Sequence, residues 1–237
     1  MKTSNKILLS LFIAVLLIVT GIHVALTQKY KNGQFTITHS GPKKDSIVLQ
    51  PVKYVRLRSL ENVLLVPSDS YRLEVSKNMP SSFRYAVSGD TLVITGDSST
   101  SSGDAWDIGR RTHGDVTLHL PEIALIVAQN TSLKIEGRSD TARGAATRIE
   151  LSESALEFSN ELNKGNIARY FGDVFISAKQ GSEVVLSPNK IHFNTLSFEL
   201  EKSIFRDNES GDIKNLMITT DDSSLVQVSG HNLKKLK

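Results

Sequence analysis

The sequence predicts an all-β protein in which short strands stack as a β-solenoid, or β-helix, behind one N-terminal transmembrane helix. Three observations lead to this fold class. From residue 52 onward, apolar and polar residues alternate in short runs such as Val55-Arg56-Leu57, and this period of two is typical of half-buried strands. Turn-forming clusters such as Ser88-Gly89-Asp90 separate the runs. In the second half, a unit of strand, polar turn, serine and strand recurs.

The N-terminal element is an apolar segment from Ile7 to Leu26 that carries no charged residue. A helix of this length spans roughly 30 Å of hydrocarbon. It is either an uncleaved anchor or a cleaved secretory signal. A signal peptide needs small residues at the third and first positions before its cleavage site. The C-terminal end of this segment offers only poor pairs such as His23 with Ala25. We therefore interpret residues 1–27 as a membrane anchor in preference to a signal.

Residues 28–51 are predicted to form a basic linker. The range 29–58 holds seven basic residues and one acidic residue, Asp45. Counted alone, this positive charge directs the following domain to the cytoplasm. Long folded segments, however, cross membranes largely regardless of charge, and exported chains begin with a short basic head and an apolar segment. We therefore expect the C-terminal domain to lie outside the cytoplasm.

Residues 52–237 are predicted to form one β-repeat domain. The serines of the recurring unit are separated by 22, 28, 21 and 21 residues: Ser132, Ser154, Ser182, Ser203 and Ser224. Such a period suits a solenoid, because each coil buries its inward residues only by stacking on its neighbours. At each corner, the serine hydroxyl can satisfy a neighbouring backbone group. A β-sandwich with polar turns is the alternative.

Three segments resemble one known family: residues 55–79, residues 89–99 with Gly89, Leu92 and Ile94, and residues 116–137 with Leu120 and Pro121. The chain from residue 52 to residue 230 is similar to the auto-transporter adhesin head domain family, also called the GIN domain. The resemblance implies a bacterial cell envelope protein with a right-handed, solenoid-like head. It transfers no catalytic residue.

The sequence contains no recognisable catalytic, metal-binding or cofactor-binding motif. There is no Gly-x-Ser-x-Gly, His-Glu-x-x-His, phosphate-loop or EF-hand pattern, and the absence of cysteine excludes disulfides and thiolate metal sites. The last residues, 231–237, contain Lys234, Lys235 and Lys237 without interleaved aromatic residues. This pattern indicates a charged cap on the last coil and no nucleic-acid site. We expect no enzyme activity, no cofactor and no metal.

A loop from Asp97 to Asp115 holds the candidate binding residues. It contains the only tryptophan, Trp106, close to Arg110 and Arg111. An indole beside guanidinium groups can stack on a sugar while the charges bind hydroxyls or carboxylates, which favours an acidic glycan as ligand. The alternative is that Trp106 fills one end of the core and the charges are solvated.

These observations predict an exported, membrane-anchored, non-catalytic β-repeat module for adhesion, glycan or envelope-protein binding, or envelope architecture. Three alternatives stay open. A cytoplasmic scaffold would polymerise beneath the membrane, a polysaccharide-active enzyme would cluster carboxylates on one face, and an envelope-stress sensor would couple a ligand to a membrane partner.

Overall fold

A computed structural model describes residues 12–13, 15–21, 23, 44–77, 79, 81–96, 115–139, 146–159, 168–186, 190–208 and 211–236. The chain divides into two compact units, residues 1–41 and 42–237. In the first unit, residues 12–13, 15–21 and 23 are helical and exposed. Within these described ranges, no helix has both the length and the apolarity needed to cross a membrane.

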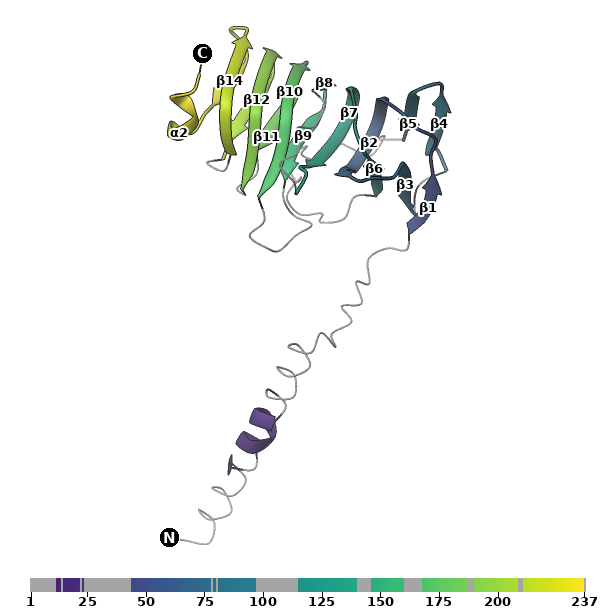
Figure 1. The fold of residues 1–237 in the computed structure, drawn as a ribbon, viewed down its shortest axis with the longest axis vertical. Helices are drawn as coiled ribbons and strands as arrows, with labels where there is room; N and C mark the ends of the chain where they lie inside the picture. Colours follow the sequence, from purple (N-terminus) through teal and green to yellow (C-terminus); the bar gives the residue numbers. More distant parts are fainter. Residues whose placement is uncertain are drawn as a thin grey trace. The chain divides into compact units, whose positions relative to one another are not determined.

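The second unit is built from strands, which confirms the predicted all-β class (Figure 1). Its elements are β1 (Lys44–Val48), β2 (Tyr54–Pro67), β3 (Arg72–Ser76), β4 (Arg84–Ser88), β5 (Thr91–Thr95), β6 (Val116–Leu120), β7 (Leu125–Glu136), β8 (Thr147–Ser152), β9 (Ala155–Ser159), β10 (Arg169–Lys179), β11 (Glu183–Leu186), β12 (Ile191–Glu201), β13 (Ile204–Asp207), β14 (Gly211–Thr220), β15 (Leu225–Gln227) and α2 (Gly230–Leu233). The strands join in one large sheet that is not closed.

Two parallel ladders run through this sheet. The first follows the order β2, β7, β8, β10, β12 and β14, which lie side by side in Figure 1. The second starts from the last part of β7 and continues through β9, β11, β13 and β15. In the second ladder Leu156 pairs with Val184, and Val184 pairs with Phe205. Apolar residues thus lie directly above one another, level after level.

The N-terminal part of the unit pairs in antiparallel fashion. Strand β1 pairs with β3, β3 pairs with β6, and β4 pairs with β5. Strand β1 lies in the range expected to be a basic linker, and its Ile47 faces Leu73 across the pairing. The regular stacking of parallel strands therefore begins at β2, which pairs in parallel with β5, β6 and β7.

Strands β10, β12 and β14 each bend near their middle. In β10 the buried Val174 follows the inward-facing Phe171 after three residues, and in β12 the buried Leu196 follows Phe193 at the same interval. Regular alternation would place inward residues two apart, so the strand turns a corner at this point. Asparagine side chains connect the corners, because Asn194 donates to Asp173 Oδ1 (2.6 Å) and Asn215 donates to Asn194 O (3.2 Å).

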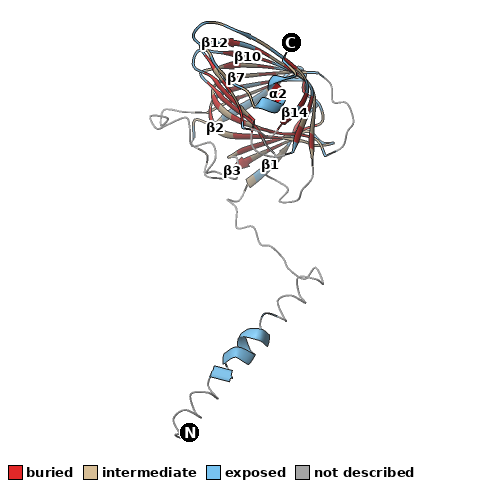
Figure 2. Ribbon diagram, turned by 90° about the vertical axis from the view of Figure 1, so that its left-hand side faces the viewer, coloured by how far each residue is buried: buried red, intermediate tan, exposed pale blue. Residues whose placement is uncertain are grey.

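The core lies between the ladders, and its buried residues recur along the strands of both (Figure 2). Its largest fully buried side chains include Phe158, Phe198, Phe205, Leu57, Ile94 and Ile126. Burial of such side chains contributes about 1.5–3 kcal/mol each, so the stacked levels hold one another together through this common core.

A column of hydroxyl groups marks the corner between the two ladders. The Thr131 backbone N–H donates to Ser154 Oγ (3.1 Å), and the Ser154 N–H donates to Ser182 Oγ (3.2 Å). The Ser203 N–H likewise donates to Ser224 Oγ (3.1 Å). The predicted corner role of serine is therefore seen at several levels. At the β7 corner, however, the stacked residue is Thr131 and not Ser132, because Ser132 is paired with Ala155 in the ladder.

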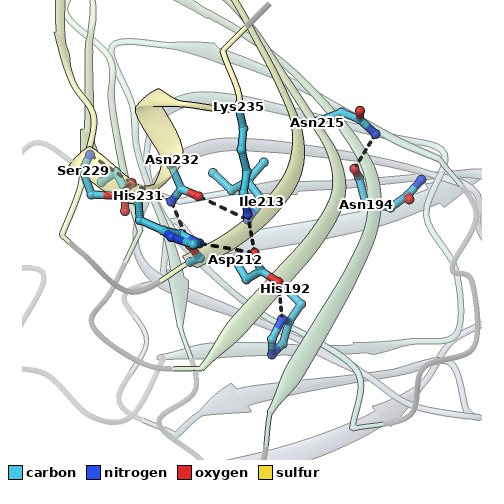
Figure 3. Close-up of polar contacts among 11 residues, drawn as sticks. His192, Asn194, Asp212, Ile213, Asn215, Ser229, His231, Asn232 and Lys235 are labelled. Carbon is cyan, nitrogen blue, oxygen red and sulfur yellow. Dashed lines mark hydrogen bonds and ion pairs between the residues drawn. The ribbon is translucent and has the colours of Figure 1, made fainter.

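The short helix α2 closes the C-terminal end of the first ladder (Figure 3). Its fully buried Asn232 donates to Gly211 O (2.7 Å) and to Asp207 Oδ2 (2.8 Å), and it accepts from the Ile213 N–H (3.4 Å). Ser229 also donates to Asp207 through its hydroxyl (2.6 Å). One side chain thus satisfies backbone groups at the outer edge of β14, as a further strand would.

Charged groups support this cap on the outside (Figure 3). Lys235 Nζ lies 2.5 Å from Asp212 Oδ1, and His192 and His231 lie 3.5 Å and 3.7 Å from the same carboxylate. The hydrogen bond from Lys235 holds the pKa of Asp212 below its ordinary value. The C-terminal segment predicted as a charged cap therefore contacts the last strand, through a buried amide as well as through charge.

Candidate binding site

The predicted binding residues Trp106, Arg110 and Arg111 lie outside the described residues. The nearest described residues on either side are Gly96 and Asp115. The Gly96 N–H donates to Arg58 O (2.9 Å), and Asp115 O accepts from the Ser76 N–H (2.8 Å). The structure thus describes where this segment leaves β5 and enters β6.

A row of outward-facing side chains crosses the first ladder at one register. We call it the outer row, and it consists of Tyr54, Leu125, Arg148, Phe175, Ser197 and Met217 on β2, β7, β8, β10, β12 and β14. Neighbouring strands lie about 4.8 Å apart. The row therefore presents one side chain every 4.8 Å or so along the stack.

The outer row exposes large apolar side chains. Tyr54 is 40% exposed, Phe175 is 42% exposed and Met217 is 39% exposed. Beside Phe175 lies a groove of about 320 Å³, lined by residues of β8, β10 and β12: Arg148, Phe175, Ile176, Ser177, Ser197 and Glu199. Its volume falls at the lower end of the range of small-molecule sites, about 300–1,000 Å³.

Charged groups flank the aromatic ring in this groove. Arg148 Nε lies 3.1 Å from Glu150 Oε1, and both side chains are well exposed. Glu199 is exposed on the neighbouring strand. A flat aromatic ring can pack on the apolar face of a sugar ring, while guanidinium and carboxylate groups bind its hydroxyls. The groove therefore has the chemistry needed to bind a polar, ring-shaped ligand.

Sequence reasoning missed Phe175, although the sequence carries its signal. In the segment Asp173 to Lys179, the apolar residues Val174, Ile176 and Ala178 alternate as the inward set. Phe175 is out of phase with them and must therefore point outward. An aromatic residue on the polar face of an alternating strand was the available indication of a surface site.

A second polar cluster lies on the antiparallel part of the sheet. Lys44 Nζ donates to Thr117 Oγ1 (2.7 Å). Glu74 Oε1 lies 3.4 Å from Arg72 Nη2 and also 3.4 Å from His119 Nε2. Burial lowers the pKa of Lys44 and that of His119 from their ordinary values. A lysine beside a hydroxyl resembles a base and its nucleophile. Thr117 is only 4% exposed, so a substrate could not reach its hydroxyl in this arrangement.

Among the described residues, no group of three or more His, Asp or Glu side chains is arranged to hold a metal ion. The clusters around Asp212 and Glu74 instead pair carboxylates with cations. Their chemistry is that of ion pairs that fix strands and α2 in place.

The fold and the groove describe an all-β protein with a candidate binding face. No family model and no curated protein sequence matches the chain. Among solved structures, it is similar to a "putative adhesin" from Parabacteroides distasonis, with 11% identity, a TM-score of 0.49, and coverage of 78% of this chain and 72% of the other. It is also similar to a "putative lipid binding protein" from the same species, with 10% identity, a TM-score of 0.36, and coverage of 80% and 94%. A "putative cell adhesion protein" from Clostridium sporogenes shows 13% identity, a TM-score of 0.29, and coverage of 79% and 100%.

Proposed function

We propose that this chain is a non-catalytic binding module of the bacterial cell envelope, and that its outer row binds a glycan. The observation that carries the proposal is Phe175, an aromatic ring 42% exposed on the outward face of β10 and flanked by charged side chains. Exposing a phenylalanine in water forgoes the free energy gained by burying it, about 1.5–3 kcal/mol. A ligand that covers the exposed 42% of Phe175 recovers the corresponding part of this free energy.

The repeated architecture suits such a role. We interpret the two parallel ladders, with corner hydroxyls that recur after 21 to 28 residues, as coils of a solenoid related to the GIN domain. A stack of coils presents equivalent positions at even intervals along one face. That spacing allows a linear polymer to contact several levels together, which increases affinity through multiple weak contacts.

We further propose that residues 7–26 anchor the module to the membrane with its C-terminal domain outside the cytoplasm. The uncharged sequence of this segment supports the anchor. Trp106, Arg110 and Arg111 remain proposed as a second contact with the glycan. A binding module would bind the glycan without cleaving it, whereas a polysaccharide-active enzyme would cleave it.

The test is a glycan array probed with the full chain in detergent, comparing wild type with Phe175→Ala. We expect wild type to bind a subset of glycans and Phe175→Ala to lose at least tenfold in affinity, because the ring stacks on the sugar. The matched control is Tyr85→Ala on β4, which removes an aromatic ring that is also 42% exposed but lies outside the outer row.

Equal loss in the two variants, or binding unaffected by Phe175→Ala, would contradict the proposal. Release of shorter sugars from a bound glycan would instead establish the enzyme. A single Ser99→Cys variant, labelled with a membrane-impermeant maleimide in spheroplasts before and after lysis, tests the orientation, since the chain has no other cysteine. Labelling only after lysis would favour the cytoplasmic scaffold.

A further inference from the structure

Two outward-facing rows of side chains meet in the groove beside Phe175. In the outer row, Arg148 on β8 and Ser197 on β12 are the register partners of Phe175. Two residues further along the strands, Ser177 pairs with Glu199. Glu199 therefore lies diagonally from Phe175. One strand step of about 4.8 Å and two residues of about 3.3 Å each place their Cα atoms roughly 8 Å apart. A single sugar-sized ligand can contact both side chains.

Two cations near the groove are already paired with carboxylates. Arg148 Nε lies 3.1 Å from Glu150 Oε1, and Lys179 Nζ lies 3.7 Å from Glu201 Oε2. Glu199, which lines the groove, is exposed. No hydrogen bond or ion pair joins the Glu199 carboxylate to another residue in the part of the chain that the structure describes. The groove thus carries one uncompensated negative charge.

The other groups in the groove suit a hydroxyl-rich ring that carries a positive charge. Ser177 and Ser197 line it, and a serine hydroxyl both donates and accepts hydrogen bonds. The face of an aromatic ring such as Phe175 packs on the apolar face of a sugar. The same face attracts a cation that lies within about 6 Å of the ring centroid.

We propose that the groove selects sugars with a free amino group, so that the glycan bound by the outer row is a polymer of amino sugars. This inference rests on the proposed glycan-binding function. The sugar ring stacks on Phe175, and its ammonium group pairs with the Glu199 carboxylate. Acetylation of the amine removes the positive charge and with it the ion pair. For two unit charges about 4 Å apart in water, the loss corresponds to roughly fivefold in affinity.

The charge of the whole chain makes this preference a local property. The formal net charge is +3 at pH 7, so the molecule as a whole does not attract a polycation. The predicted loop residues Arg110 and Arg111 are basic as well and favour an acidic glycan. A preference for the amino form of a sugar therefore reports on Glu199 and its surroundings.

The test is calorimetric titration of the full chain in detergent with two probes, a glucosamine hexamer and the same hexamer with every amine acetylated. We expect wild type to bind the amino hexamer about fivefold more tightly at low ionic strength. The preference should fall below twofold at 1 M salt, where the Debye length is about 3 Å.

Glu199→Gln removes the charge and keeps the size of the side chain. We expect this variant to bind the two hexamers equally and to bind the acetylated hexamer as wild type does. The matched control is Glu122→Gln, which removes the same charge at an exposed position between β6 and β7. It is expected to keep the fivefold preference.

Three results would overturn the inference: equal binding of the two hexamers by wild type, a preference that persists in Glu199→Gln, or no binding of the amino hexamer. None of them decides the proposed function, which depends on the loss of glycan binding in Phe175→Ala. In that variant we expect both hexamers to bind more weakly, because the stacking surface is lost for either form. Failure of one proposal is thus distinguishable from failure of the other.

Discussion

Residues with positive φ recur at the corner between the ladders. Asn130, Glu153, Gln180 and Lys202 have φ values between 48° and 55°. This left-handed conformation costs roughly 1–2 kcal/mol for residues other than glycine, and asparagine tolerates it best. At three of these corners the next residue in the chain belongs to the hydroxyl column: Thr131, Ser154 and Ser203. At the fourth corner, Gly181 separates Gln180 from Ser182. The hydroxyl column therefore holds the strained corners in place, level by level.

Ser182 is the most deeply buried member of that column. Its hydroxyl donates to Lys179 O (2.6 Å) while accepting from the Ser154 N–H. Ser182→Ala is expected to destabilise the protein by about 1–3 kcal/mol, because a buried N–H loses its acceptor. Guanidinium unfolding followed by circular dichroism measures the change. Ser197→Ala, on the outward face, is the control, and an equal loss there would contradict the assignment.

The role of serine at the corners could be predicted because each hydroxyl also donates to a backbone oxygen a few residues before it, as Ser154 does to Ser152 O and Ser203 does to Glu201 O. The choice of Thr131 over Ser132 could not, since it depends on which residue of β7 is in register with β9. Arg138 is a similar case. Its contacts with Pro121 and Tyr170 join residues 17 and 32 positions away in the chain, and no local pattern records them.

At the level of elements, α2 takes the place of a strand on β14. A helix of four residues has little stability of its own, so its position depends on its contacts with the ladder. The sequence suggested a cap formed by lysines. The structure adds the buried amide of Asn232, whose partners Asp207 and Gly211 precede it by 25 and 21 residues.

Asn232→Ala is expected to release α2 from the edge of β14. It removes the bonds from the amide to a carboxylate and to a backbone oxygen, and it takes the acceptor away from the Ile213 N–H, which costs about 2 kcal/mol. Amide exchange at Ile213 should become roughly 30-fold faster, as measured by hydrogen-exchange mass spectrometry. His231→Ala, in the same helix but 70% exposed at its side chain, should leave exchange at Ile213 within about twofold of wild type. Unchanged exchange in Asn232→Ala would show that other contacts hold α2.

For the whole molecule, lowering the pH is expected to destabilise some levels of the stack more than others. At the C-terminal end, hydrogen bonds from Lys235 and from Ser224 hold the pKa values of Asp212 and Asp221 below the ordinary value of 3.8. Groups with a depressed pKa stabilise the fold above that value, and the contribution is lost as pH falls below it. Glu183, in β11, behaves oppositely, because burial raises its pKa and its ionisation opposes folding.

We therefore expect the last levels to open first on acidification. Pulse digestion with pepsin between about pH 5 and pH 2.5 should cut β14 and β15 before β7 and β8, with the sites identified by mass spectrometry. In the double variant Asp212→Asn with Asp221→Asn, the order of cutting should depend much less on pH. Simultaneous cutting of all levels in the unmodified chain would contradict the expectation.

In the second ladder, register partners of the last levels are 21 residues apart, from Glu183 to Ile204 and from Ile204 to Leu225. A tandem duplication of 21 codons in this region would insert one complete level, with inward residues, corner hydroxyl and bend asparagine already in register. The rod would lengthen by about 4.8 Å while its cross-section and its cap stayed the same. Copy number alone can therefore set the length of such a protein during evolution, without any change in how a single level folds.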